Sequence, residues 1–166
     1  MSALLQFDDA ASQREPMSIA DLDAVLAIEN SVYEFPWTRG NFIDSLAAGY
    51  TAQVLRAADG ALAAYCVAMA GVQETHLLNL TVAPAWQHRG LGRALLDALA
   101  AHSRAAGAHT LWLEVRESNQ RAREVYRRYG FEPVGWRRGY YPAAAGRRED
   151  ACVMRLPLVE GRDALE

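Results

Sequence analysis

The amino-acid sequence predicts a mixed α/β domain with a twisted, mostly antiparallel sheet of about seven strands flanked by about four helices. Short apolar runs bounded by turn residues alternate with helical patterns, in the order β-α-α-β-β-β-α-β-α-β-β. The strongest helical segment, Leu91–Ala106, links two apolar runs that should therefore lie side by side and parallel. The other neighbouring strands are expected to be antiparallel.

Two helices are expected near the start of the chain. Ser18 is a favourable N-cap residue and is followed three residues later by an acid, the pattern of a capping box. That helix should end near Tyr33, because Pro36 disfavours helical backbone in the residue before it. Thr38 can cap a second, shorter helix, which Gly49 is well placed to end.

The remaining elements follow from apolar patterning and from the turn residues between the runs. We expect strands over Thr51–Ala57, Ala61–Val72, Glu74–Val82, His109–Arg116, Phe131–Tyr141 and Asp150–Leu158, and helices over Leu91–Ala106 and Gln120–Tyr129. The segment Ala58-Asp59-Gly60 indicates a hairpin between the first two of these strands. Gly107 and Gly130 close the two helices.

The length of 166 residues suits one domain. We expect a loose lead-in over residues 1–13, a single domain over residues 14–158 and a tail over residues 159–166. Residues 1–11 contain no basic residue, unlike a secretory signal. The longest uncharged stretch, Gly60–Gln73, is shorter than the roughly 18 residues that a membrane span needs. The expected location is therefore cytoplasmic.

The composition excludes several kinds of chemistry. All 17 basic residues are arginine, so the chain has no Walker-type phosphate loop, Schiff-base lysine or pyridoxal-phosphate lysine. Cys66 and Cys152 lie far apart within apolar runs, and the four histidines show no metal-ligand spacing. We expect two buried, reduced thiols, no metal site, and histidines in surface or packing positions.

Charge is distributed unevenly along the chain. Residues 1–86 contain 3 arginines and 10 acids, a net charge of −7, whereas residues 87–166 contain 14 arginines and 10 acids, a net charge of +4. The basic half could bind an anionic ligand and the acidic half could face a basic substrate. An equally good alternative is that the surface charges scatter by chance.

The most informative segment runs from Val82 to Arg93, where a strand ends, a glycine-containing turn follows and a long helix begins. The first N–H groups of a helix carry partial positive charge and lack partners inside the helix, so they can bind phosphate. Gly90 and Gly92 would let a ligand approach the backbone closely. The dinucleotide fingerprint is not met, because its third glycine is missing. By itself the spacing also fits an ordinary helix N-terminus.

The motif Gln87-x-x-Gly90-x-Gly92 after a strand resembles the acyl-coenzyme A motif of the Gcn5-related N-acetyltransferases, the GNAT family. The segment from Asn119 to Phe131 carries the asparagine–tyrosine–glycine–phenylalanine pattern that is a second hallmark of that family. Together with the element order, the resemblance covers nearly the whole chain. It implies the GNAT fold, acetyl-coenzyme A as co-substrate without a metal, and acetyl transfer to an amine.

Three further segments resemble one branch of the family, the bacterial enzymes that acetylate the N-terminal alanine of ribosomal protein eighteen of the small subunit. They are Phe35-Pro36-Trp37, Leu111–Arg116 and Tyr140-Tyr141-Pro142. One departure is the doubled Arg147-Arg148, where a single arginine is expected before the acids. The resemblance implies that the partner is the N-terminus of a ribosomal protein or a similar basic peptide beginning Ala-Arg, and neither nucleic acid nor a membrane.

The resemblance also implies roles for particular residues. Glu114 would be the general base that takes the amine proton, and Tyr126 the general acid that protonates the departing thiolate. The end of the strand would pair with the pantetheine arm, and the turn would bind the pyrophosphate through its amides. The residues expected to bind acetyl-coenzyme A are Leu80, Thr81, Val82, His88, Arg89, Gly90, Leu91, Gly92, Arg93 and Asn119.

The residue types suit this chemistry independently of the resemblance. A carboxylate can take an amine proton directly or through a water, and a tyrosine hydroxyl can protonate a thiolate. Structural alternatives stay open, because Glu114 could instead form an ion pair with Arg116, and Tyr126 could be a packed aromatic residue. Glu29 and Glu34, beside the Phe35-Pro36-Trp37 loop, could attract a basic peptide or could be solvated residues at a helix end.

Two other functions also stay open. One is acetylation of a small amine such as a polyamine, an amino acid or an antibiotic, and the other is non-catalytic sensing of an acyl-coenzyme A. Glu114 and Tyr126 favour catalysis over sensing, and the two aromatic segments around Pro36 and Pro142 favour a peptide over a small amine. Those aromatic residues lie either in the core or at the rim of an acceptor site. The oligomeric state leaves no signal in the sequence.

Overall fold

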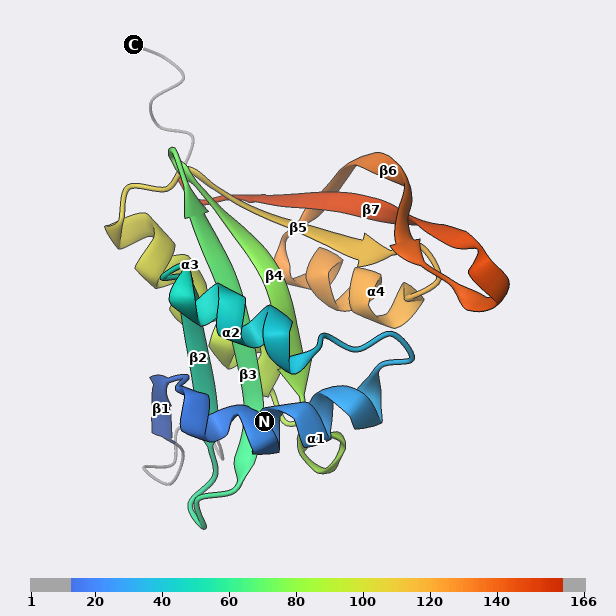
Figure 1. Cartoon of the computed structure of the whole chain (residues 1–166). Helices are drawn as coiled ribbons and strands as arrows, with labels where there is room; N and C mark the ends of the chain where they lie inside the picture. Colours follow the sequence, from blue (N-terminus) through green and yellow to red (C-terminus); the bar gives the residue numbers. More distant parts are fainter. Residues whose placement is uncertain (1–12, 160–166) are drawn as a thin grey trace. The chain divides into compact units, whose positions relative to one another are not determined.

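The computed structural model describes residues 13–159 (Figure 1). The lead-in expected over residues 1–13 lies outside the described residues except for Gln13, which begins the first strand. The expected tail also lies outside them except for Val159. Within the described residues, no helix is long and apolar enough to span a bilayer.

The described residues form seven strands and four α-helices in the predicted order. The strand order in the sheet is β1-β2-β3-β4-β5-β7-β6, and β4 and β5 pair in parallel, whereas β1–β2, β2–β3, β5–β7 and β6–β7 pair antiparallel. The strands are β1 (Gln13–Pro16), β2 (Thr51–Arg56), β3 (Leu62–Gly71), β4 (Glu74–Val82), β5 (Thr110–Arg116), β6 (Glu132–Pro142) and β7 (Arg148–Pro157). The helices are α1 (Leu22–Val32), α2 (Arg39–Ala47), α3 (Leu91–Ala105) and α4 (Gln120–Tyr129).

The chain divides into two compact units. The first holds the chain up to Met69 together with Leu78–Ala98, and the second holds Ala70–Leu77 together with the chain from Leu99 onward. Strands β3 and β4 and helix α3 therefore each contribute residues to both units. The single domain expected over residues 14–158 stays a prediction.

Ser18 and Thr38 cap the two helical segments of the first unit as the sequence indicates, although α1 itself begins only at Leu22. The Ser18 N–H donates to the Asp21 carboxylate (2.8 Å), and a short 3-10 turn there leads into α1. Helix α1 ends at Val32, and Tyr33 has extended backbone. The Asn41 N–H donates to the Thr38 hydroxyl (3.2 Å) at the start of α2, as expected of an N-cap.

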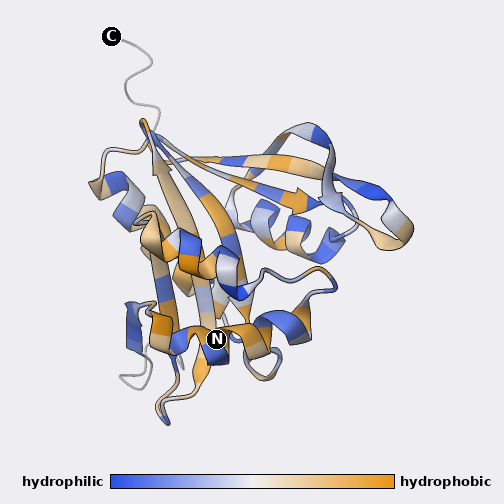
Figure 2. Cartoon of the chain, in the orientation of Figure 1, coloured by the Kyte–Doolittle hydropathy of each residue, from blue (hydrophilic) through white to orange (hydrophobic). Residues whose placement is uncertain are grey.

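The core of the first unit lies where α1 and α2 pack on β2 and β3. Its aromatic rings are in contact: the Phe42 ring lies 5.1 Å from the Trp37 ring and 6.0 Å from the Tyr65 ring. In Figure 2, β3 is coloured mostly toward the hydrophobic end, which agrees with its burial. Burying a large apolar side chain contributes about 1.5–3 kcal/mol. The buried members of this core are Met17, Leu22, Val25, Phe42, Ala52, Val54, Tyr65 and Val67.

The second unit is built on the strands β5, β7 and β6. Strand β5 pairs along its whole length with β7, from Thr110 opposite Pro157 to Arg116 opposite Ala151. The two cysteines are buried free thiols, as predicted, with Cys66 in the first unit and Cys152 in the second.

The doubled arginine lies where β6 turns into β7. Arg148 begins β7, and its guanidinium donates to the carbonyls of Gly139 (2.9 Å) and Tyr140 (3.0 Å) on β6. A 3-10 turn over Ala144–Gly146 precedes it, so the extra residue is accommodated in the connection. One of the two arginines therefore has a structural role in this hairpin.

Candidate active site

The expected phosphate-binding turn joins β4 to α3 within the first unit. Ala94 N–H donates to Gly90 O (3.0 Å), so the N–H groups of Leu91 and Gly92 precede the first hydrogen bond of the helix. His88 and Gly90 have left-handed backbone, with φ of 64° and 82°. At Gly90 this conformation favours glycine, whereas its surroundings leave space for a side chain.

Arginines flank this turn. The Arg89 guanidinium lies 4.9 Å from the centre of the Trp86 ring, and both Arg89 and Arg93 are exposed. A Cβ at Gly92 would lie 3.8 Å from Val82 Cγ2, an ordinary contact. The helix start therefore combines N–H groups, positive side chains and small residues, which suits an anion.

The end of β4 extends beyond its pairing with β5, which covers Glu74–Leu77. The Ala83 N–H donates to Ala63 O on β3 (2.8 Å). In a regular antiparallel strand, the N–H and C=O of one residue face the same edge, and those of the next residue face the other edge. Leu80 and Val82 then face the edge away from β3, whereas the backbone of Thr81 faces β3.

Side chains bind the carbonyls of that outer edge. The Tyr33 hydroxyl donates to Leu80 O (3.3 Å), and Gln87 Nε2 donates to Val82 O (3.3 Å). Gln87 is the glutamine of the motif Gln87-x-x-Gly90-x-Gly92, and its side chain holds the end of β4 next to the turn.

A buried hydrogen-bonded network lies behind the same strand end. The Tyr33 hydroxyl contacts Thr81 Oγ1 (2.8 Å), which donates to Asn79 Oδ1 (2.7 Å). Asn79 Nδ2 and the Tyr65 hydroxyl both donate to Glu29 Oε1, at 2.8 and 3.0 Å. The network thus joins α1, β3 and β4 and ends on one carboxyl group.

Glu29 is only 1% exposed. Its surroundings show that one expectation was wrong: Glu29 is neither a charge at the rim of an acceptor site nor a solvated residue at a helix end. Burial raises the pKa of Glu29, while the hydrogen bonds from Asn79 and Tyr65 act in the opposite direction. Burial also raises the pKa of Tyr33 to about 12. Glu34, in contrast, is exposed.

Glu114 lies on β5 in the second unit, and both of its carboxylate oxygens have side-chain partners. His76 Nε2 on β4 is in hydrogen-bond contact with Glu114 Oε2, and Arg137 Nε on β6 lies 3.0 Å from Oε1. Arg116, which the sequence left open as a partner of Glu114, pairs with Glu149 (3.0 Å).

The contact of His76 was not foreseen from the sequence. The histidines were expected in surface or packing positions, and His76 instead hydrogen-bonds the expected general base. A signal was present, because His76 lies in a strand that was predicted to run parallel to the strand of Glu114. Among residues 13–159, no group of three or more potential metal ligands is close enough to hold a metal ion.

Asn119 precedes the first residue of α4, and Tyr126 lies in the last turn of that helix. The Tyr126 ring packs edge-to-face on the Phe131 ring, with centres 5.6 Å apart, so the tyrosine does have a packing role. Asn119 is the N-cap of α4, and its side-chain oxygen accepts from the Ala122 N–H (3.1 Å). The proposed contacts of both residues with a coenzyme stay predictions.

The aromatic pair of the second unit is partly exposed. Tyr140 is 44% exposed and packs edge-to-face on Tyr141, with ring centres 4.8 Å apart. The Arg116 guanidinium lies 4.5 Å from the centre of the Tyr141 ring. The pKa of the Tyr141 hydroxyl is raised, chiefly by burial and then by the nearby Tyr140 and Glu114.

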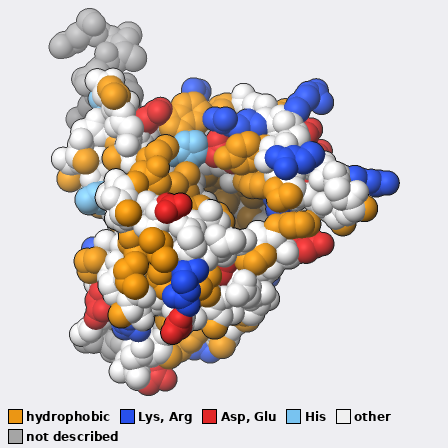
Figure 3. All heavy atoms as spheres, viewed as in Figure 1, with side chains coloured by type: hydrophobic (Ala, Val, Ile, Leu, Met, Phe, Trp, Pro, Cys, Tyr) orange, Lys and Arg blue, Asp and Glu red, His pale blue; other side chains and the backbone are white. Residues whose placement is uncertain are grey.

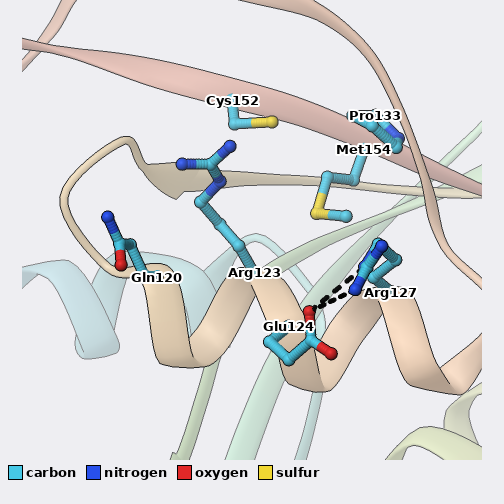
Figure 4. A pocket seen from close by; sticks show the side chains of 7 residues that line it. All are labelled: Gln120, Arg123, Glu124, Arg127, Pro133, Cys152 and Met154. Atoms are coloured by element: carbon cyan, nitrogen blue, oxygen red, sulfur yellow. Dashed lines mark hydrogen bonds and ion pairs between the residues drawn. The ribbon is translucent and has the colours of Figure 1, made fainter.

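A cavity of about 400 Å³ separates α4 from β6 and β7 (Figure 4). Its charged groups have partners: Arg127 pairs with Glu124 (2.7 Å), and Arg123 donates to Glu117 O (3.0 Å). Figure 3 shows arginine side chains gathered over the β6 and β7 part of the second unit. The cavity is lined by Gln120, Arg123, Glu124, Arg127, Pro133, Cys152 and Met154.

The order of the strands and helices, and the parallel β4–β5 pair, are those of the α/β fold with a mostly antiparallel sheet that the sequence predicts. Residues 22–131 match the acetyltransferase (GNAT) family, and the chain belongs to that family. This result confirms both the family resemblance and the fold expected from it.

Two relatives that are 40% and 39% identical to this chain share one name. The ribosomal protein bS18-alanine N-acetyltransferase of Salmonella typhimurium is 40% identical over 142 residues, which are 86% of this chain and 95% of the relative. The protein of the same name from Escherichia coli is 39% identical over 142 residues, which are again 86% of this chain and 95% of the relative. The crystal structure of the ribosomal-protein-S18-alanine N-acetyltransferase from Escherichia coli matches with a TM-score of 0.82 at 36% identity, covering 93% of this chain and 99% of that one.

Proposed function

We propose that this protein transfers an acetyl group from acetyl-coenzyme A to the α-amine of an N-terminal alanine, with ribosomal protein bS18 as the substrate. The observation that carries the proposal is the 40% identity to relatives of that name, over 95% of their length. A ribosomal protein as substrate also implies that the enzyme works in the cytoplasm.

The first unit supplies groups that fit acetyl-coenzyme A. The N–H groups of Leu91 and Gly92 at the start of α3, with Arg89 and Arg93 nearby, suit the pyrophosphate. The outer edge of β4 at Leu80 and Val82 suits the amide groups of pantetheine, which can pair with it like a strand. The direction of the backbone favours Leu80 and Val82 as the residues that pair with pantetheine. The Thr81 side chain instead donates to Asn79 in the buried network.

The acceptor must lose a proton for the reaction to occur. An α-amine with a pKa of about 7.7–8.0 is neutral roughly once in seven molecules at pH 7, whereas a lysine amine at about 10.4 is neutral only about once in 2,500. An enzyme that removes one proton near neutral pH therefore handles an N-terminus more easily than a lysine side chain.

The second unit supplies the expected acid and base. Bound acetyl-coenzyme A supplies the thioester whose carbonyl carbon the amine attacks. The carboxylate of Glu114 favours removal of the amine proton, and the hydroxyl of Tyr126 can donate a proton to the departing sulfur. These roles rest on the match of both residues to the family pattern.

The experiment is a thiol-release assay with acetyl-coenzyme A and matched acceptors at equal concentration. The acceptors are an Ala-Arg peptide, the same peptide with a blocked N-terminus and one internal lysine, and spermine. The proposal predicts rapid thiol release with the first acceptor and at least about tenfold slower release with the others. Faster release with spermine would favour a small-amine acetyltransferase, and binding of acetyl-coenzyme A without thiol release from any acceptor would favour a sensor.

A further inference from the structure

The histidine next to Glu114 is the more accessible member of the pair. The Glu114 side chain is 6% exposed, whereas that of His76 is 23% exposed. The carboxylate is bound on one oxygen by His76 and on the other by Arg137. An acceptor amine would therefore meet the imidazole more readily than the carboxylate.

We propose that His76 takes the proton from the acceptor amine, and that Glu114 acts through His76 as a positioning carboxylate. This inference rests on the acetyl transfer proposed above and changes the identity of the group that touches the amine. It assigns a catalytic role to a residue that no motif marks.

The contact with Glu114 determines which imidazole nitrogen can act as the base. A carboxylate accepts hydrogen bonds, so Nε2 carries the hydrogen that faces Glu114 Oε2. In a neutral imidazole the other nitrogen, Nδ1, then has the free lone pair. Within residues 13–159, Nδ1 has no protein partner. A carboxylate that fixes the tautomer and stabilises the imidazolium is a general arrangement for histidine bases.

The transfer then balances in protons and electrons. The amine nitrogen bonds to the acetyl carbon and gives one proton to His76 Nδ1, while the carbon–sulfur bond breaks and its electron pair stays on sulfur. The sulfur takes a proton from the Tyr126 hydroxyl. Afterwards His76 releases its proton to solvent and Tyr126 regains one from solvent, so the products are the acetylated amine and the free thiol.

An imidazole suits this task better than a carboxylate alone. Its ordinary pKa of about 6.5 lies closer to that of an α-amine, about 7.7–8.0, than the ordinary pKa of a glutamate, about 4.3, does. A base is most effective when its pKa lies near the working pH. The charged and titratable groups around the His76–Glu114 pair are Arg116 on β5, Arg137, Tyr140 and Tyr141 on β6, and Glu149 on β7.

The test compares two histidine variants in steady-state kinetics with the Ala-Arg peptide. His76→Gln keeps an N–H group that can reach Glu114 but cannot take a proton. The matched control is His102→Gln, which changes an exposed histidine on α3. We expect His76→Gln to lower kcat about 10²-fold, to leave acetyl-coenzyme A binding unchanged in calorimetry, and to change the pH dependence of kcat/KM.

A second variant keeps the inference testable if His76→Gln folds poorly. In His76→Ala, added imidazole should raise the rate in proportion to its concentration, because a free imidazole can take the proton in place of the side chain. If the wild-type protein is active and His76→Gln keeps kcat within about twofold with the same pH profile, the role of His76 is wrong. That result would leave the proposed acetyl transfer intact. An unchanged His76→Ala rate on adding imidazole would also contradict that role. Wild-type protein that acetylates no peptide would instead overturn the proposed function.

Discussion

Tyr126 has a packing contact and a proposed catalytic role, and removing its hydroxyl would separate the two. The ring packs on Phe131, and the hydroxyl is the proposed acid. Tyr126→Phe keeps the ring contact, so we expect the melting temperature and acetyl-coenzyme A affinity to stay near the wild-type values while kcat falls at least about tenfold. Thermal melts, calorimetry and steady-state rates measure these quantities. A large loss of stability with normal specific activity would identify Tyr126 as a core residue only.

Glu29 should make the stability of the protein depend on pH. Its pKa is raised by burial above the ordinary value of 4.5, so the folded state holds the proton more tightly than the unfolded state. The stabilisation from this group is complete below about pH 4.5 and is lost as the pH rises through the folded pKa. Glu29→Gln cannot ionise, and its side-chain oxygen can still accept from Asn79 and Tyr65.

The measurement for Glu29 is the melting temperature between pH 4.5 and pH 8. Wild-type protein should lose stability relative to Glu29→Gln as the pH rises through the raised pKa of Glu29 in the folded state. An identical pH dependence in both proteins would show that the carboxyl group titrates alike in the folded and unfolded states. The matched control is Glu34→Gln, because Glu34 is exposed on the same segment.

At the scale of elements, the start of α3 should determine coenzyme affinity. Gly92→Val adds a branched side chain beside the first N–H groups of the helix, where the proposed pyrophosphate approaches. The structure has room for it, since the nearest atom to a Cβ there is Val82 Cγ2 at 3.8 Å. We expect acetyl-coenzyme A to bind at least about tenfold more weakly, which is about 1.4 kcal/mol.

The control for this variant is Ala94→Val, which places the same branched side chain at an exposed position one turn into α3. Both proteins should show similar melting temperatures. Calorimetry that finds equal affinities in Gly92→Val and Ala94→Val would mean that the phosphates bind elsewhere.

The elements themselves were predictable because local signals determine them. The bounds of β4 and α4 agree with the sequence prediction, and the other elements with predicted bounds differ by at most two residues. An apolar run that ends before Pro84 marks β4, and the terminal glycine Gly130 marks the end of α4. Neither signal depends on contacts distant in the sequence.

The contacts of the site could not be predicted in the same way. Glu29 was interpreted as a charge beside the Phe35-Pro36-Trp37 loop, and its true partners, Tyr65 and Asn79, are 36 and 50 residues away. Likewise, Glu114 meets His76 and Arg137 only through the order of the strands in the sheet. Residue spacing describes a helix or a strand well, but it does not give the partners of a buried side chain.

At the scale of the whole molecule, charge should influence which peptides are acetylated. The first half of the chain has a net charge of −7, and the exposed Glu34 borders the Phe35-Pro36-Trp37 loop. Negative charge on the protein speeds its association with a basic peptide. Dissolved salt screens this attraction, so the effect weakens as the salt concentration rises. We expect kcat/KM for an Ala-Arg peptide to exceed that for an Ala-Glu peptide, and the ratio to shrink as salt rises.

Glu34→Arg should lower the ratio of kcat/KM for the Ala-Arg peptide to that for the Ala-Glu peptide. Asp44→Arg is the control, because it makes the same change of net charge at an exposed position on α2, outside the loop. Equal rates on basic and acidic peptides at low salt would contradict the role of charge and would leave acetyl transfer itself unaffected.

The proposed reaction places one acetyl group on one α-amine, that of an N-terminal alanine. The most direct measurement uses unacetylated bS18 incubated with this protein and acetyl-coenzyme A, followed by tandem mass spectrometry that locates the added acetyl group. We predict one acetyl group per molecule, on the α-amine of the N-terminal alanine, and none when that alanine is replaced by proline. Acetyl groups on lysine side chains, or unmodified bS18 after complete incubation with active enzyme, would contradict the account.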